Sequence, residues 1–397
     1  MSSHLPRSSR IITALLAAGA IAVTAGCSGG LAGGGDPAES GAAPEGPIAL
    51  GMLAPFSGSE SAFGVYMQQG AELAIQEINA DGGVLGQELE LVVEDDACDA
   101  TTSVAAANKL VTEGVVASVG GYCSGATLPT LPIFDQAGIP MVIPAANSND
   151  LPDAGLPGVF LINGTGTQQA QSAVQYAQQE GATSVAVIDD ATSYSADLAE
   201  AFVEQADQAG VEVAFEATVT PGENDYASVA TQLAQAAPDL VYWTGYYQEG
   251  ALINRQSVDA GYDGIFMVAD GSIDGSFAEI TGDDYIANVV GTFTQTPDML
   301  VGAESWIADY TELAGAAPGP YSTQAYDAVR IVAQAMEDAG STDFDAVVAA
   351  LEGLDEYETF AGPLTFTDTH TRESGGFVIV SIDPESGEFV LKDDLQG

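Results

Sequence analysis

Small, hydroxyl and aromatic residues gather in six short segments, each of which follows an apolar run of the sequence. The segments read APFSG (54–58), GYCSGAT (121–127), PAANS (144–148), DDATSYS (189–195), TGYYQE (244–249) and ADGS (269–272). None contains Lys, Arg or His, so they offer no side chain that could neutralise a phosphate, a sulfate or a dicarboxylate. A pocket built from these segments would suit a zwitterion, a cation or a neutral solute.

Three polar residues in these segments could hold the two ends of a zwitterion. Ser124 precedes a helical segment, so its hydroxyl and the free N–H groups there could bind a carboxylate. Asn147 can donate and accept in the same way, and Asp270 could pair with an ammonium. Simpler readings stay open, with Ser124 as a helix cap, Asn147 in a turn and Asp270 as a solvated acid. Three tyrosines could contact a ligand or simply pack: Tyr194, Tyr246 and Tyr321.

Cys98 and Cys123 allow two interpretations. An exported chain meets oxidising conditions, so the pair is predicted to form a disulfide, worth about 3 to 4 kcal/mol in the chain-entropy model. The alternative is a thiol hydrolase, because GYCSG (121–125) fits a nucleophile elbow with Cys in place of Ser, and His370 lies downstream. That reading requires a free Cys123.

The chain has too few Cys and His residues for a zinc site, and no cofactor is implied. Asp95, Asp96 and Asp99 lack the spacing of an EF-hand loop, so we expect them to be exposed acids and predict no metal site.

The elements that would position these segments alternate between strands and helices. Strands are expected at 48–53, 88–96, 115–121 and 139–145, with helices ending near 81 and 114. After about residue 166 the pattern starts again, with helices ending near 181, 210, 237 and 261 and strands at 184–190, 211–219, 239–246 and 265–271. This order predicts an α/β protein of two doubly wound parallel-sheet lobes, with a ligand cleft beyond the carboxyl ends of the strands.

The first residues resemble a bacterial lipoprotein signal peptide. Arg7 and Arg10 precede an apolar stretch, 11–23, which is too short to span a bilayer, and TAGC ends at Cys27. Residues 1–26 are predicted to be removed, Cys27 to be lipidated and 27–47 to be a flexible tether to the outer face of the membrane. A non-lipidated secretory signal stays open, because Thr24 stands where Leu is commoner.

The composition is strongly acidic, with 57 Asp and Glu against 7 Lys and Arg and a formal net charge of -50. Nucleic acids and anionic membrane surfaces are therefore excluded as partners, because both are bound through cationic side chains. Self-repulsion on this scale suggests a salt-adapted protein, and an ordinary acidic exported protein is the alternative.

From residue 48 to about 380 the chain resembles the leucine/isoleucine/valine-binding proteins of bacterial ABC importers, which have the type I periplasmic-binding fold. The stretches that carry the resemblance include GAELAIQEINADGG, EDDACDATTSVAAANKLVTEG, CSGATLP, IPAAN, VTPGENDY, WTGYYQEGALINRQS and AGPLTF. The resemblance implies a hinge between lobe 1 (48–165 and 295–368) and lobe 2 (166–294 and 369–397), and it implies the Cys98–Cys123 disulfide.

The resemblance also assigns ligand contacts. Ser124 and the Tyr246 hydroxyl would bind the ligand carboxylate, Asn147 both ends, and the Ala145 carbonyl and Asp270 the ammonium. The side-chain pocket would be lined by Phe63, Tyr122, Ala146, Tyr194 and Tyr321.

Several of these residues depart from the family pattern. Asn147 stands where Thr is usual, Asp270 replaces a longer Glu, Phe63 replaces Tyr, and Tyr122 is bulkier than the usual Leu. Branched-chain amino acids are therefore a default, and other amino acids, small amides or urea-like solutes stay open.

The implied function is solute capture by a monomer that presents its ligand to an ABC permease and its ATPase subunits. A ligand-sensing receptor subunit would use the same pocket.

Overall fold

The computed structural model describes residues 46–395. The predicted signal peptide, Cys27 and nearly all of the predicted tether lie outside the described residues. Within 46–395, no helix combines the length and the apolar character needed to cross a membrane.

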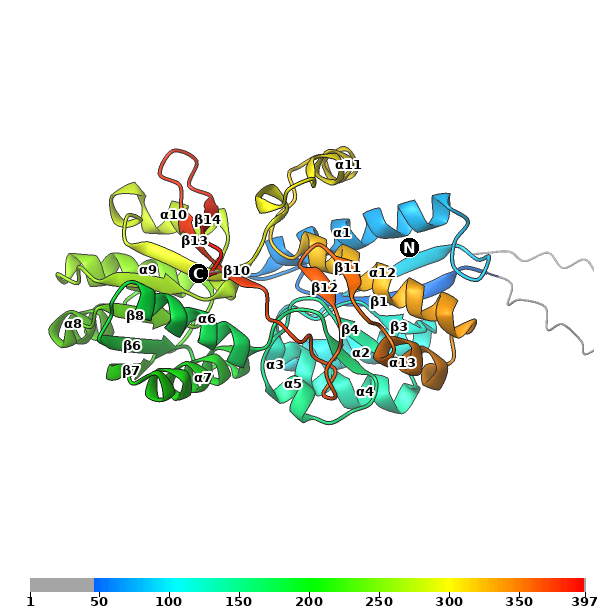
Figure 1. Ribbon diagram of the computed structural model, residues 1–397, viewed down its shortest axis with the longest axis horizontal. Helices are drawn as coiled ribbons and strands as arrows, with labels where there is room; N and C mark the ends of the chain where they lie inside the picture. Colours follow the sequence, from blue (N-terminus) through cyan, green and yellow to red (C-terminus); the bar gives the residue numbers. More distant parts are fainter. Residues whose placement is uncertain (1–45, 396–397) are drawn as a thin grey trace, which may run out of the picture. The chain divides into compact units, whose positions relative to one another are not determined.

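The first sheet has five parallel strands in the order β2-β1-β3-β4-β5. The strands are β1 (Ile48–Ala54), β2 (Leu89–Asp95), β3 (Ala117–Ser118), β4 (Met141–Ile143) and β5 (Val159–Leu161). Its helices are α1 (Ser61–Ala80), α2 (Ala100–Glu113), α3 (Ser124–Thr127), α4 (Leu131–Ala137), α5 (Asp150–Asp153), α11 (Glu304–Ala314), α12 (Ser322–Ala339) and α13 (Phe344–Glu352). Strands β1, β3, β4 and β5 are almost wholly buried, as expected for a parallel sheet covered on both faces (Figure 1).

The second sheet has the order β14-β13-β10-β9-β8-β6-β7. Its strands are β6 (Ser184–Asp189), β7 (Glu212–Thr218), β8 (Leu240–Trp243), β9 (Ile265–Val268), β10 (Val289–Thr294), β13 (Phe377–Ile382) and β14 (Phe389–Asp393). The accompanying helices are α6 (Gly166–Gln179), α7 (Ser193–Ala209), α8 (Ala227–Ala236), α9 (Tyr247–Asp259) and α10 (Gly275–Thr281). The predicted α/β class with parallel sheets is confirmed.

Two strands at one edge of the second sheet were not predicted. β13 is antiparallel to β10 and to β14. Parallel neighbours need a crossover connection, and here β13 joins β14 through a short loop, so the two strands pair as a hairpin. The second sheet is therefore mixed rather than purely parallel.

Helix ends follow the local sequence. The Asp99 side chain accepts a hydrogen bond from the Thr102 N–H at the start of α2, and Gly114 ends that helix at a φ of 81°. In the second sheet Thr192 caps α7 in the same way, and Gly210 ends it at a φ of 71°. The glycines are the signals by which the ends of these two helices were predicted, whereas the caps Asp99 and Thr192 were not part of the prediction.

The chain passes between the two sheets in three segments, from β5 to α6, from β10 to α11, and after the small hairpin of β11 (Tyr357–Thr359) and β12 (Gly362–Leu364). Arg372 ties two of these segments together, because its guanidinium donates to the Ile162 carbonyl at 3.1 Å and to the Ala361 carbonyl at 3.1 Å. The lobe bounds given above remain a prediction.

Candidate ligand-binding site

Asp270 lies at the centre of a buried polar network beyond the end of β9. It opens a 3-10 helix, Asp270–Ser272, and only 2% of its surface is exposed. Its carboxylate accepts hydrogen bonds from Asn147 Nδ2 at 3.1 Å, Gln169 Nε2 at 3.0 Å, and the hydroxyls of Tyr194 and Tyr321, both at 2.5 Å. Asn147 follows β4 and Tyr321 precedes α12, so the carboxylate gathers donors from elements packed on both sheets.

Every donor that residues 46–395 offer to Asp270 is electrically neutral. Burial raises the pKa of the Asp270 carboxyl, and the hydrogen bonds from Tyr194, Tyr321 and Gln169 oppose that rise. Among residues 46–395, Asp270 has no ion-pair partner. A buried carboxylate without a counter-charge is costly, so the arrangement favours a ligand that brings a positive group.

Gln169 is a member of the network that the sequence analysis missed. It lies on α6, is fully buried, and also donates to Thr292 Oγ1 at 2.9 Å while accepting from Asn147 Nδ2 at 2.9 Å. Thr292 in turn shares a 2.8 Å hydrogen bond with the Tyr242 hydroxyl. In the sequence Gln169 stands in a glutamine-rich helix, and nothing there distinguishes it from the exposed glutamines beside it.

Four tyrosines surround a small cavity next to Asp270. The cavity has a volume of about 10 Å³, room for about one water molecule, and its other lining residues are Ala145, Asn147, Asp270 and Gly271. The Tyr122 ring lies 5.7 Å from the Tyr321 ring and 6.3 Å from the Tyr246 ring, and Tyr194 lies 5.4 Å from Tyr246. The predicted ligand contacts Tyr122, Tyr194, Tyr246 and Tyr321 thus lie together around one acid.

Tyr321 reaches Asp270 through an unusual backbone conformation. Its φ is 63°, in the left-handed region that bulky residues rarely adopt, and it is the N-cap residue of α12. Strain of this kind is concentrated at functional sites.

Phe63 and Ala146 lie behind the cavity rather than on its wall. The Phe63 ring stacks on the Tyr122 ring with centroids 4.6 Å apart, so it supports a lining residue. Ala146 packs in the core cluster that contains Leu53 and Leu110, and its N–H donates to the Gly121 carbonyl.

Of the two predicted oxygen contacts Ser124 and Ala145, Ala145 lines the cavity and Ser124 does not. Ser124 is the first residue of α3, whose N-cap is Cys123, so the simple reading of Ser124 as a helix cap is wrong. Its buried hydroxyl oxygen accepts from the Ser148 N–H at 3.3 Å. Ala145 lines the cavity, and its carbonyl oxygen accepts one hydrogen bond, from Asn163 Nδ2 at 2.8 Å. A carbonyl oxygen has two lone pairs, so the second can accept from a ligand.

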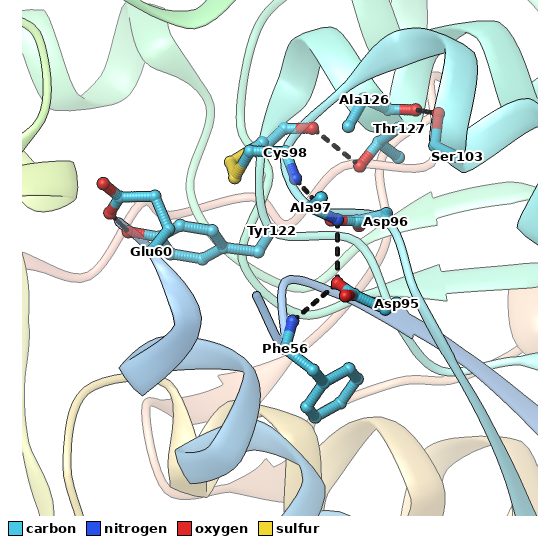
Figure 2. The surroundings of a disulfide bond; sticks show 11 residues. Phe56, Glu60, Asp95, Asp96, Ala97, Cys98, Ser103, Tyr122, Ala126 and Thr127 are labelled. Carbon is cyan, nitrogen blue, oxygen red and sulfur yellow. Dashed lines mark hydrogen bonds between the residues drawn. A yellow bond between two sulfur atoms is a disulfide. The ribbon is translucent and has the colours of Figure 1, made fainter. Parts of the chain in front are cut away.

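Cys98 and Cys123 form a disulfide with Cα atoms 5.4 Å apart (Figure 2). The bond joins the loop after β2 to the residue before Ser124. Since the sulfur of Cys123 is bonded, it cannot act as a thiolate, and the hydrolase interpretation is wrong.

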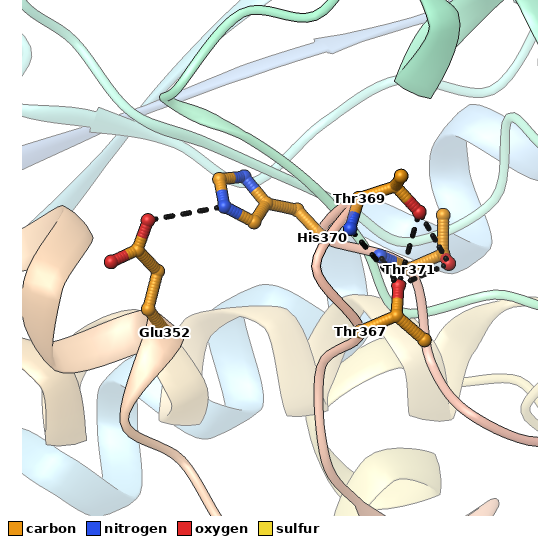
Figure 3. Close-up of polar contacts among 5 residues, drawn as sticks. All are labelled: Glu352, Thr367, Thr369, His370 and Thr371. Atoms are coloured by element: carbon orange, nitrogen blue, oxygen red, sulfur yellow. Dashed lines mark hydrogen bonds and ion pairs between the residues drawn. The ribbon is translucent and has the colours of Figure 1, made fainter.

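His370 takes part in a different contact. Its Nε2 lies 3.2 Å from Glu352 Oε1 (Figure 3). Its ring stacks on the Phe160 ring with centroids 4.2 Å apart. The adjacent Thr367, Thr369 and Thr371 bond to one another, which orders this connecting segment. His370 therefore has a structural setting and not the setting of a general base.

The acids near the disulfide differ from the expectation. Asp99 is exposed, but Asp96 is only 1% exposed, because the loop that carries the disulfide covers it and the Cys98 N–H binds its carboxylate at 2.9 Å. Burial raises the pKa of Asp96 to about 6. Within 46–395, no group of three or more His, Cys, Asp or Glu residues is arranged to hold a metal ion.

Comparison with known proteins gives the family. Residues 47–388 match the model of the periplasmic binding protein family. A Leu/Ile/Val-binding protein homolog of Brucella melitensis is 34% identical over 85% of this chain and 91% of its own length. The leucine-, isoleucine-, valine-, threonine-, and alanine-binding protein of Pseudomonas aeruginosa is 30% identical over 84% of this chain and 89% of its own.

Solved structures agree with these relatives. The leucine-binding protein LivK of Thermotoga maritima has a TM-score of 0.79 at 26% identity, covering 87% of this chain and 97% of its own. LivJ of Streptococcus pneumoniae in complex with isoleucine has a TM-score of 0.77 at 25% identity, covering 87% of this chain and 100% of its own. The chain therefore belongs to the branched-chain amino acid family of type I periplasmic binding proteins, which are substrate-binding proteins of transporters and not enzymes.

Proposed function

We propose that this chain is the extracytoplasmic substrate-binding lipoprotein of an ABC importer and that it captures an amino acid between its two lobes. The observation that carries the proposal is Asp270, a buried carboxylate held by four neutral donors with no ion-pair partner within residues 46–395. An ammonium group on the ligand would supply the missing charge.

The opposite pole of the ligand has donors of its own. The buried Ser124 hydroxyl, the N–H groups at the start of α3 and the Tyr246 hydroxyl are assigned to the ligand carboxylate. These groups carry no formal positive charge, so they suit a carboxylate whose charge is already balanced within a zwitterion. Branched-chain amino acids are the default ligands, because the relatives are named as binding proteins for leucine, isoleucine and valine.

The proposed mechanism is capture followed by closure. The ligand first docks on Ser124, Ala145 and Asn147 of lobe 1, and Tyr194, Tyr246 and Asp270 of lobe 2 then close over it. The Asn147–Asp270 hydrogen bond of 3.1 Å supports this mechanism, because it joins a residue assigned to lobe 1 to a residue assigned to lobe 2. Because only the closed form makes both sets of contacts, the ligand shifts the population toward the form that a permease would bind.

A thermal-shift screen of all amino acids, small amides, urea and polyamines tests the proposal. A ligand at 100 times its dissociation constant adds about 2.7 kcal/mol to the free energy of unfolding. We expect Asp270→Ala to abolish the response to amino acids, because it removes the partner of the ammonium.

The matched control is Asp263→Ala, which removes an exposed acid shortly before β9 and should leave the response unchanged. An undiminished response in Asp270→Ala would remove the role assigned to that residue. If no amino acid shifts the melting of the oxidised protein, the proposed function fails.

A further inference from the structure

Glu60 is a second buried carboxylate that the site described so far does not use. It is the N-cap residue of α1, but its side chain makes no capping hydrogen bond, and only 4% of its surface is exposed. Its carboxylate instead lies at the hydroxyl end of Tyr122, with Oε2 and the phenol oxygen 3.5 Å apart (Figure 2). An acid at this position that does not cap its helix needs another explanation.

Among the described residues, no positive group lies beside Glu60. Its neighbours are the Ser59 and Tyr122 hydroxyls and the carboxylates of Glu249 and Asp274. Burial, together with these two acids, raises the pKa of Glu60 to about 8. Within 46–395 the ion pairs join Lys109 to Glu94 and Glu113 and His370 to Glu352, so none involves Glu60.

Tyr122 connects Glu60 to the cavity beside Asp270. One end of its side chain contacts Glu60, while its ring lines that cavity. The ring also packs edge-on against Tyr321, whose hydroxyl donates to Asp270. Two uncompensated acids therefore lie at two ends of one cluster of tyrosine rings.

We infer that the ligand carries a second positive charge, which pairs with Glu60, and that it is a basic amino acid with an unbranched side chain, such as ornithine, lysine or arginine. The inference rests on the proposed function, because it takes Asp270 as the partner of the α-ammonium. A zwitterion with one ammonium would compensate one of the two buried acids and leave the other without a partner.

The aromatic surroundings fit the same ligand. Faces of tyrosine rings attract ammonium and guanidinium groups and accept an aliphatic stem alongside. Phe63 and Tyr122, both assigned to the wall of the side-chain pocket, stack at 4.6 Å, and the Tyr122 ring is the one that lines the cavity. An unbranched chain with a cationic tip would extend from the cavity along the Tyr122 ring, whose hydroxyl lies 3.5 Å from Glu60 Oε2.

The test is calorimetric titration of the whole oxidised chain with lysine and with norleucine, which has the same carbon chain without the terminal ammonium. We expect lysine to bind at least 10-fold more tightly than norleucine, as a charged hydrogen-bonded contact commonly contributes about 10- to 100-fold. Glu60→Gln should remove most of this difference by weakening lysine while leaving norleucine within about threefold. The comparison of lysine with norleucine is made in the unaltered protein, so it does not depend on whether the Glu60→Gln variant folds.

The matched control is Glu249→Gln. Glu249 is near Glu60 but half-buried on α9, and its Oε1 accepts from the Gly222 N–H at 2.8 Å, a contact that glutamine can keep. Lysine affinity should stay within about threefold in this variant. An equal loss in both variants would mean that the negative potential of the region, and not pairing with Glu60, attracts the ligand.

Three further outcomes separate this inference from the proposed function. Equal affinity for lysine and norleucine, or a Glu60→Gln variant with unaltered lysine binding, would overturn the inference and would assign Glu60 as a protonated structural residue. Binding of leucine and norleucine that depends on Asp270, without binding of lysine, would keep the proposed function and overturn the inference. Loss of binding for every amino acid would overturn both.

Discussion

Two buried aspartates, Asp270 in the site and Asp327 beside the connecting segments, have the same exposed fraction of 2% and opposite surroundings. Asp327 accepts from the Phe360 N–H at 2.8 Å and lies in the field of Arg330 and Arg372. Burial raises its pKa to about 7, and the backbone bond and the two arginines oppose that rise. Within the described part of the chain, Asp270 has neutral donors only.

The difference separates structural from functional burial of charge. At Asp327 the protein supplies its own cations, and one of them, Arg372, also holds the carbonyls of Ile162 and Ala361. Asp270 has no ion pair among residues 46–395, and under the proposed function the ligand's ammonium supplies the counter-charge. Asp96 is also buried beside a neutral donor, so what marks Asp270 is that it lacks a cation among residues 46–395 and also lines a cavity.

The largest expected effect on the free energy of unfolding comes from removing a cation near Asp327. Arg372→Met should lower the free energy of unfolding by about 3 kcal/mol, because it leaves two backbone carbonyls without their buried donor and removes a positive charge that opposes the raised pKa of Asp327. Urea unfolding, followed by tryptophan fluorescence, measures the change.

The counterpart variant for this measurement is Asp270→Asn, which neutralises the uncompensated acid. Its free energy of unfolding without ligand should equal or exceed that of the unaltered protein, since a buried charge is removed. A loss as large as that of Arg372→Met would show that Asp270 is a structural carboxylate and would break the comparison.

A smaller effect should appear in the pH dependence of the free energy of unfolding. It decides whether Glu60 is an uncompensated buried acid like Asp270 or a compensated one like Asp327. The pKa of Glu60 is raised from 4.5 to about 8 in the folded protein, so its stabilising contribution is complete below about pH 4.5 and is lost as the pH rises toward 8. We expect the difference in unfolding free energy between pH 5 and pH 8 to shrink by up to about 3 kcal/mol in Glu60→Gln.

Other buried acids titrate in the same window, so the comparison with Glu60→Gln isolates the contribution of one group. Asp96 and Asp327, with pKa values of about 6 and about 7, are present in both proteins, so their contributions to the pH dependence cancel in the difference. Identical pH dependence in the two proteins would mean that Glu60 is not desolvated in solution.

The smallest effect per group concerns the surface acids. We propose that the formal net charge of -50 reflects adaptation to salt, and we expect the thermal midpoint to rise by a few degrees between dilute buffer and molar salt. Screening acts on exposed charges, so the difference between Asp270→Asn and the unaltered protein should stay constant over the same range. A midpoint that does not rise would refute the adaptation to salt.

The sequence predicted the site through residues that follow strands. Ser124, Asn147, Tyr194, Tyr246 and Asp270 come directly after expected strands or at helix starts, and parallel strands bring their carboxyl ends to one edge of a sheet. It could not identify Gln169 or Glu60, because a glutamine within a helix and one acid among 57 have no local signal of burial. It also did not predict the hairpin of β13 and β14, whose partner β10 lies far away along the chain.

By itself the sequence determined the alternation of strands and helices, the helix ends at Gly114 and Gly210, and a site without basic side chains, because these depend on local periodicity, capping and residue type. Only the tertiary structure decided which acids are buried, which of them have a cation, and which rings stand between them. Burial and charge compensation depend on distant segments that meet only in the folded chain, as Asp270 does with Asn147 and Tyr321.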